Sequence, residues 1–556
     1  MKEKRDKTIR RLSVFLGMAL VSFYAFLSHL FFPTQIFTDS LVDCYYVEKA
    51  FQAHGAVKGN YLNAFGHILQ NWFYYFAGKI MEFCGYHGRL LFPLQTTSIL
   101  FATLAVLVMY LILLHLFKEP WSAFLTSAVL GFGYSFWFWS GQVKSYPIAT
   151  FFVLLAFYFY IRISSWRGVI LSSLSSVLAI GFFQGSCAFV GVMLIFILID
   201  SRPLRKRILN AALYFFPCAL FVALIYFFIS GATENSYILS WKNIHAAWDM
   251  FWRASSEGQI PSAVPRNSSF FPHSLAQHLS LLAYNIVSET FIPIGPMMFS
   301  AFATIFDQSA PVLKLNPVLD YIVLSGIGLI LIVFFINIKK IWPTHGKFFI
   351  LSLVWLLFFG SVFFFVDATH PYLYICTVGL LIFTGTISAS SKPARFILLV
   401  IMFILFAANY HQLKSGHYED RALSELKTTQ SVVRAGDSFI FGLFKGSSFG
   451  SNWSITYYYL VDMIYLEDYQ IDEFNQGWFP SVLSADIHNA INKGGRVFIN
   501  RTGFSNCFPP QEKDAVWKVW SSEFDLLPVF KLNEYYSSLG PREESYYMIR
   551  DKVRRK

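Results

Sequence analysis

Long runs of apolar residues recur along this chain and constrain its fold more than any other feature. The stretch LLFPLQTTSILFATLAVLVMYLILLHLF, residues 90–117, contains no Asp, Glu, Lys or Arg. Crossing the hydrocarbon core of a bilayer takes about 20 such residues in a helix. Only 14% of the residues are charged, against about a quarter in soluble domains. Membrane β-barrels show alternating segments of about ten residues, a pattern absent here. The sequence therefore predicts a polytopic α-helical membrane protein.

Eleven transmembrane spans are predicted from the apolar runs. Their approximate limits are Leu12–Phe32, Leu90–Phe117, Trp121–Ser140, Tyr146–Ile163, Gly168–Phe182, Ser186–Ile199, Ile208–Ile229, Val318–Ile338, Phe348–Val366, Tyr372–Ile387 and Phe396–Asn409. The basic N-terminus precedes the first span without a small-residue cleavage site, which indicates an uncleaved signal anchor.

The distribution of basic residues predicts which side of the membrane each loop occupies. With a cytoplasmic N-terminus, every inner loop is basic, as the positive-inside rule requires. This assignment needs residues 168–199 to form two short spans that turn at residues 181–185. It also needs two apolar segments, His278–Phe306 and Gly66–Phe83, to be interfacial or re-entrant. The expected location is the plasma or inner membrane.

The domain organisation follows from the same assignment. Residues 1–410 are expected to form the transmembrane domain, with outer loops 33–89 and 230–317. Residues 411–556 are more polar and contain short strand-like runs such as DSFIFG and GRVFIN, which predict a small outer-face α/β domain. The net charge is +11. The basic residues lie in short loops between apolar spans rather than in a groove, which argues against a nucleic-acid partner.

Polar residues from distant parts of the sequence are expected at the outer face. They are Asp39, Asp43, His67, Gln142, Lys144, Tyr146, Gln184 and His370. Each has a purely structural alternative. The two aspartates could mark the end of a span or cap a helix, and Lys144 could extend to the membrane surface. Gln184 and His370 could serve a turn and a helix start, and Tyr146 could anchor the interface. If residues 39–43 are helical, Asp39 and Asp43 share one face.

A carboxylate and a cation at this face would suffice for transfer from a lipid-linked phosphate. The carboxylate can accept a proton from an attacking hydroxyl, and Lys144 or His370 can offset the phosphate charge. A lipid phosphate leaves as a stable anion, so this minimal set requires no metal.

The chain resembles the GT-C superfamily of membrane glycosyltransferases over about residues 10–410. It is most similar to the protein O-mannosyltransferase-like and aminoarabinose-transferase-like branches. FTDS after the first span, GYSFWFWSGQVKSYP, the hairpin VILSSLSSVLAIGFFQGSCAFVG and DATHPYLY carry this resemblance. A soluble outer tail is common in such enzymes.

The resemblance implies a polyprenyl-phosphate-linked sugar donor and a lipid, glycan or protein acceptor at the outer face. It implies Asp39 as the general base, with Asp43 as a second acidic group. Lys144 and His370 would bind the donor phosphate, and Gln142, Tyr146, Gln184 and His67 would line the pocket.

Departures from the family pattern leave several alternatives open. The chain has Gln142 and Lys144 where relatives often have glutamate, and Gln184 where they often have histidine. These differences leave donor identity and dependence on a divalent metal open. A transporter or flippase for lipid-linked solutes is one rival, although it would place ionisable residues deep in the spans. A non-catalytic membrane scaffold and a polysaccharide polymerase or ligase are the others.

Overall fold

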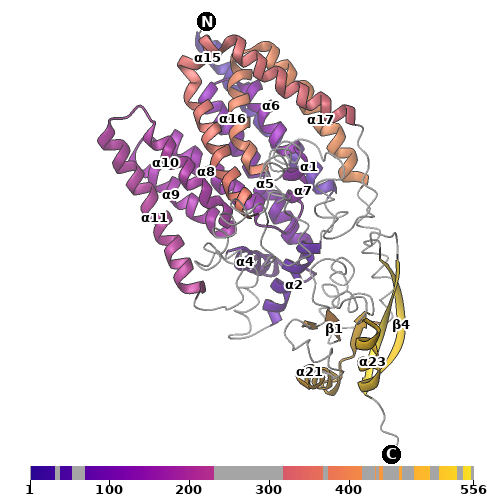
Figure 1. The fold of residues 1–556 in the computed structure, drawn as a ribbon. Helices are drawn as coiled ribbons and strands as arrows, with labels where there is room; N and C mark the ends of the chain where they lie inside the picture. Colours follow the sequence, from indigo (N-terminus) through magenta and orange to yellow (C-terminus); the bar gives the residue numbers. More distant parts are fainter. Residues whose placement is uncertain are drawn as a thin grey trace, which may run out of the picture. The chain divides into compact units, whose positions relative to one another are not determined.

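The structure is a computed structural model, shown in Figure 1. It describes residues 2–31, 38–52, 69–230, 317–366, 374–415, 432–433, 437–441, 462–465, 481–500, 513–534 and 542–551. The chain divides into two compact units. The first contains the apolar helices, and the second contains a β-sheet near the C-terminus together with the helical residues 38–49.

The first unit is built from long apolar helices. Four of the described helical segments are long and apolar enough to cross a membrane: Thr8–Leu30, Leu91–Phe117, Leu204–Leu224 and Lys392–Tyr410. They lie in α1 (Lys2–Phe31), α5 (Leu91–Phe117), α11 (Leu204–Ser230) and α17 (Lys392–Ser415). Shorter apolar helices accompany them, including α16 (Tyr374–Ser390). The chain is therefore a helical membrane protein.

The segment predicted to form a short hairpin does turn back on itself. It consists of α9 (Trp166–Phe182), the 3-10 turn η2 (Gln184–Ser186) and α10 (Cys187–Leu198). It packs beside α8 (Tyr146–Arg162) and α11 (Figure 1). The ends of α8 and α10 meet where the Tyr160 hydroxyl donates a hydrogen bond to Asp200, at 3.0 Å. The loops after α8 and α10 therefore lie at one end of this group, as the charge pattern predicts.

A second contact joins two of the basic loops. Arg395, in the first turn of α17, forms an ion pair of 3.1 Å with Glu119, which precedes α6 (Pro120–Phe132). The carboxylate of Glu119 also accepts a hydrogen bond from the Ser122 backbone N–H and so caps α6. The loops predicted to share the inner side are thus in direct contact.

The single span predicted at 121–140 is divided into two helices. α6 ends at Phe132 and α7 (Tyr134–Ser140) begins after Gly133. A helix break leaves carbonyl groups without helical partners, and the Asn409 side chain of α17 donates a 2.7 Å hydrogen bond to the Phe132 carbonyl. The Trp137 ring of α7 stacks on Phe406 of α17, with centroids 6.1 Å apart. α17 therefore contacts the chain on both sides of this break.

The two spans predicted at 318–338 and 348–366 belong to α15 (Pro317–Val366), which contains Pro343. The rings of Phe334 and Phe349 stack with centroids 5.5 Å apart. Fifteen residues of a straight helix would separate them by roughly 22 Å along the axis. The element therefore folds back sharply between these two residues, which makes its two arms antiparallel neighbours.

The segment predicted at 66–83 to lie in the interface forms the amphipathic helix α4 (Gln70–Phe83). Gln70, Asn71 and Tyr74 are buried, whereas Phe76 and Ile80 are exposed. Its described side chains thus divide into a polar inner face and an apolar outer face. The other such segment, His278–Phe306, lies outside the described residues.

The second unit contains a five-stranded sheet in the order β2-β1-β3-β5-β4. Its strands are β1 (Ser438–Phe441), β2 (Asp462–Tyr465), β3 (Val497–Asn500), β4 (Phe524–Glu534) and β5 (Arg542–Asp551). β2, β1 and β3 are parallel, and β5 is antiparallel to β3 and β4. The helices α21 (Ser481–Asn492) and α23 (Lys513–Glu523) contribute Leu483, Ile487 and Trp520 to its core.

A partly buried ion pair connects the starts of the parallel strands β1 and β3. The Arg496 guanidinium makes two contacts with Asp437, of 3.1 and 2.6 Å. The Ser438 N–H donates to the Arg496 carbonyl at 2.8 Å. Asp437 is 3% exposed, so this bidentate pair stabilises strand pairing from within the unit.

Candidate functional site

The loop between α7 and α8, residues 141–145, holds two of the residues predicted to form the site. Its tight turns are closed by hydrogen bonds from the Gln142 N–H to the Trp139 carbonyl, at 3.1 Å, and from the Lys144 N–H to the Gln142 carbonyl, at 2.8 Å. Pro147 then lies in the first turn of α8, where a missing N–H costs nothing. The chain therefore reverses direction here with Gln142 and Lys144 in a fixed backbone geometry.

Two side chains of α4 bind the backbone of this α7–α8 loop. The Gln70 side-chain carbonyl accepts a hydrogen bond from the Ser145 N–H at 3.1 Å. The Tyr74 hydroxyl donates to the Lys144 carbonyl at 3.0 Å and lies 2.7 Å from the Ser98 hydroxyl of α5. Because Tyr74 has one proton, Ser98 must be the donor in the second contact. These buried bonds connect α4, α5 and the loop.

Aromatic contacts join the α7–α8 loop to the turn between α9 and α10. The Tyr146 ring meets Trp139 of α7 and Phe183 of the turn edge-on, with centroids 5.6 and 5.5 Å apart. The Leu69 N–H donates to the Gly181 carbonyl at 3.0 Å, which joins the start of α4 to the same turn. Of the predicted residues, the structure thus brings Gln142, Lys144 and Tyr146 into one region with the turn that contains Gln184.

Lys144 is a charged and buried residue of the α7–α8 loop. Its exposure is 7%, and Gln142 is fully buried. Removing an ammonium group from water is costly unless polar or anionic groups surround it, and electrostatic attraction is stronger in such a place than in bulk water. The region therefore combines a desolvated cation with amide and hydroxyl groups, which suits the binding of an anion.

The two predicted carboxylates lie on helix α2 (Thr38–Gln52). Since α1 ends at Phe31, they are not at the end of the first span. Asp39 is in the first turn of α2 and Asp43 is one turn later, so both are on one face of the helix. Asp43 is 3% exposed.

Two predicted residues, His67 and His370, lie outside the described residues. Within the described ranges, the structure contains no group of three His, Cys, Asp or Glu side chains that could hold a metal ion.

Sequence reasoning missed Gln70, Tyr74 and Ser98. Gln70 is 75 residues from its partner Ser145, and Tyr74 is 70 residues from its partner Lys144. Ser98 contacts the loop only through Tyr74 and is 46 residues before Lys144. A local signal did exist for one of them, because QN at 70–71 opens an otherwise aromatic run on a helix. Such polar residues on the buried side of an amphipathic helix indicate a polar partner.

Comparisons with known proteins found no matching family model and no matching curated sequence. Among solved structures, the chain is similar to the Archaeoglobus fulgidus oligosaccharyltransferase AglB, in complex with an inhibitory peptide and a dolichol-phosphate. The TM-score is 0.47 at 12% identity, covering 87% of this chain and 69% of AglB. An A. fulgidus oligosaccharyltransferase in complex with Zn and sulfate gives a TM-score of 0.48 at 12% identity over 94% of this chain and 73% of that one.

A further match is ArnT from Cupriavidus metallidurans bound to undecaprenyl phosphate. The TM-score is 0.45 at 11% identity, covering 96% of this chain and 97% of ArnT. AglB and ArnT are GT-C membrane glycosyltransferases, the superfamily that the sequence resembles. With TM-scores below 0.5, these matches assign no activity or site to this chain.

Proposed function

We propose that the chain is a membrane glycosyltransferase that uses a sugar linked to a polyprenyl phosphate. The observation that supports this proposal is the buried Lys144 on a loop held by α4 and α5. The loop lies at the end of apolar helices of a membrane protein. A ligand with an apolar tail and an anionic head could place its tail along such helices and its head beside the ammonium group.

The proposed reaction is a displacement at the anomeric carbon of the sugar. The acceptor hydroxyl loses its proton to the carboxylate of Asp39, which acts as general base. The acceptor oxygen forms a bond to the anomeric carbon while the bond from that carbon to the phosphate oxygen breaks. The electron pair of this bond leaves with the lipid phosphate. Because the acceptor attacks from the face opposite the leaving phosphate, the configuration inverts.

The leaving phosphate gains one negative charge in this step. Lys144 stabilises that charge, and so contributes more in the transition state than in the ground state. His370 is proposed as a second phosphate ligand and Asp43 as a second acidic group. Gln142, Tyr146, Gln184 and His67 are proposed to line the pocket.

The remaining features of the sequence-based prediction also stay as proposals. They are eleven spans, a cytoplasmic N-terminus and an outer-face domain at residues 411–556. The acceptor is a lipid, a glycan or a protein, and the proposed step itself needs no metal.

Binding and transfer test the proposal separately. The probe for binding is undecaprenyl phosphate, titrated into the purified full-length protein. Lys144→Gln removes one charge-assisted contact, for which we expect an affinity loss of about 10- to 100-fold. Lys144→Arg should retain part of the affinity. The control is Lys79→Gln, which removes an exposed lysine on α4 that pairs with Glu82.

Transfer is measured in membranes supplied with polyprenyl-phosphate sugars that are labelled in the sugar. Asp39→Asn is expected to abolish transfer while expression and lipid-phosphate binding stay at wild-type levels. Full transfer by Asp39→Asn membranes would refute the assignment of the base. Wild-type binding by Lys144→Gln would refute the phosphate site.

A further inference from the structure

A group of exposed cations lies at the end of the helices opposite the α7–α8 loop. α8 starts at Tyr146, beside that loop, and ends at Arg162 after 17 residues, a length of roughly 25 Å. Arg162 and Arg167 flank the short connection between α8 and α9, and Arg205 and Lys206 are in the first turn of α11. All four side chains are exposed. We call these four residues the basic end.

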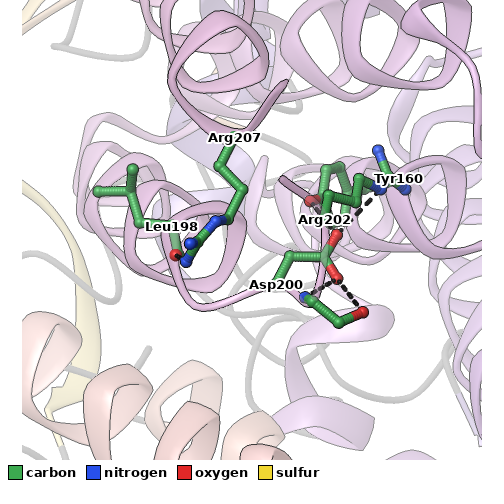
Figure 2. Close-up of polar contacts among 6 residues, drawn as sticks. Tyr160, Leu198, Asp200, Arg202 and Arg207 are labelled. Atoms are coloured by element: carbon green, nitrogen blue, oxygen red, sulfur yellow. Dashed lines mark hydrogen bonds and ion pairs between the residues drawn. The ribbon is translucent and has the colours of Figure 1, made fainter. Parts of the chain in front are cut away.

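Contacts between α8 and the loop after α10 bring the two halves of the basic end together. Figure 2 shows Tyr160 and Arg202 directed at the carboxylate of Asp200. One oxygen of this carboxylate accepts the Tyr160 hydrogen bond at 3.0 Å and forms the ion pair with Arg202 at 3.1 Å. The Arg202 guanidinium also lies 5.4 Å from the centre of the Tyr160 ring. Tyr160 is two residues before Arg162, and Arg202 is three residues before Arg205. The cations of α8 and α11 therefore lie on adjoining helix ends.

The carboxylates near this end are already bound to other groups. Asp200 accepts hydrogen bonds from Tyr160 and from the Ser201 N–H, at 2.7 Å, and pairs with Arg202. Glu119 pairs with Arg395. Within the part of the chain that the structure describes, no salt bridge neutralises the basic end. Its positive charge is therefore available to a partner.

Large apolar side chains surround the cations and indicate the kind of partner. Trp166 is 63% exposed next to Arg167, and Leu204 and Ile208, on either side of Arg205 and Lys206, are 60% and 55% exposed. A soluble acidic partner would leave these apolar groups in water. A phospholipid leaflet solvates them with acyl chains and offers its headgroups to the cations, and tryptophan favours that boundary.

We propose that the basic end binds the headgroups of anionic phospholipids in the leaflet that it faces. The alternative is that its charges only set the orientation of the helices during insertion. The two ideas differ in the folded protein, because only the first requires a preference for anionic over zwitterionic lipid. The proposal is independent of the proposed glycosyl transfer.

Native mass spectrometry of the purified full-length protein measures this preference. The protein is titrated with phosphatidylglycerol or phosphatidylcholine of equal chain length. The test variant carries Arg205→Gln and Lys206→Gln. Both positions are exposed, and losing cations at a helix N-terminus does not weaken the helix. The control carries Lys493→Gln and Lys518→Gln, an equal charge change at exposed positions of the sheet-containing unit.

We expect the wild type and the control to retain phosphatidylglycerol over phosphatidylcholine. Each cation near an anionic surface contributes about fivefold in affinity. Because the test variant lacks two cations, its retention of phosphatidylglycerol should fall by roughly 25-fold, while its retention of phosphatidylcholine stays unchanged. Equal loss in the control, or equal retention of the two lipids by the wild type, overturns the proposal. Displacement of the lipid by millimolar inorganic phosphate overturns it too, because the site would then serve a soluble anion.

Discussion

Replacing Tyr74 by phenylalanine tests whether α4 holds the α7–α8 loop in place. The substitution keeps the ring and removes a hydroxyl that donates to the Lys144 carbonyl at 3.0 Å and accepts from Ser98. The Ser98 hydroxyl keeps an acceptor, because the Leu94 carbonyl lies 3.3 Å from it. The main loss is therefore the hydrogen bond to a buried carbonyl, which costs about 1–3 kcal/mol.

We expect Tyr74→Phe to lower the free energy of unfolding by about 2 kcal/mol. The assay is equilibrium unfolding of the purified full-length protein in detergent, followed by tryptophan fluorescence. Because the loop carries Lys144, the affinity for undecaprenyl phosphate should fall as well, by up to about 30-fold if the loss of binding free energy is also about 2 kcal/mol.

Tyr86→Phe is the matched control for this experiment. Its hydroxyl also donates to a backbone carbonyl, that of Arg89 at 2.7 Å, but the pair is exposed and water can replace it. We expect a change below about 0.5 kcal/mol. If the two variants have equal stability, the contact between Tyr74 and the loop does not hold Lys144, and this reasoning is wrong.

Further substitutions probe the packing around the site and the sheet. A Cβ at Gly181 would clash with the Leu69 side chain, so Gly181→Ala should destabilise the protein by about 1–3 kcal/mol. The control is Gly360→Ala, which has open space around the new Cβ and should be neutral or stabilising. Thermal unfolding compares the stability of the two variants. Adding Leu69→Ala to Gly181→Ala should remove the clash and restore stability. Arg496→Met leaves the buried Asp437 carboxylate without its guanidinium and should cost about 3 kcal/mol. In this variant, hydrogen exchange should show that the amides of β1 and β3 lose protection while those of α5 keep it. Unchanged protection in β1 and β3 would contradict the expectation.

Helix location was predictable because it depends on local properties of the sequence. Apolar length alone locates α5 and α17, and charge alone requires the turn at 181–185, which the structure has between α9 and α10. Membrane insertion acts on each segment nearly independently, so these properties survive without knowledge of the rest of the fold.

Features that depend on distant residues were not predictable in the same way. The division of the span at Gly133 relies on Asn409, and the geometry of the α7–α8 loop relies on Gln70 and Tyr74. Nothing in the sequence around these residues identifies their partners. The roles of the candidate residues stay predictions, since Asp39 and Lys144 were chosen for chemistry that only ligand binding and transfer can test.

The bond between Asn409 and the Phe132 carbonyl has a consequence for biosynthesis. The chain leaves the ribosome from its N-terminus, so α6 and α7 enter the membrane long before α17, which is 277 residues further on. Until α17 arrives, the break at Gly133 lacks this donor and α7 lacks the Phe406 ring against which Trp137 stacks. The break between α6 and α7 therefore gains these two contacts only after α17 has been inserted, and a chain cut before Phe406 would insert α6 and α7 without them.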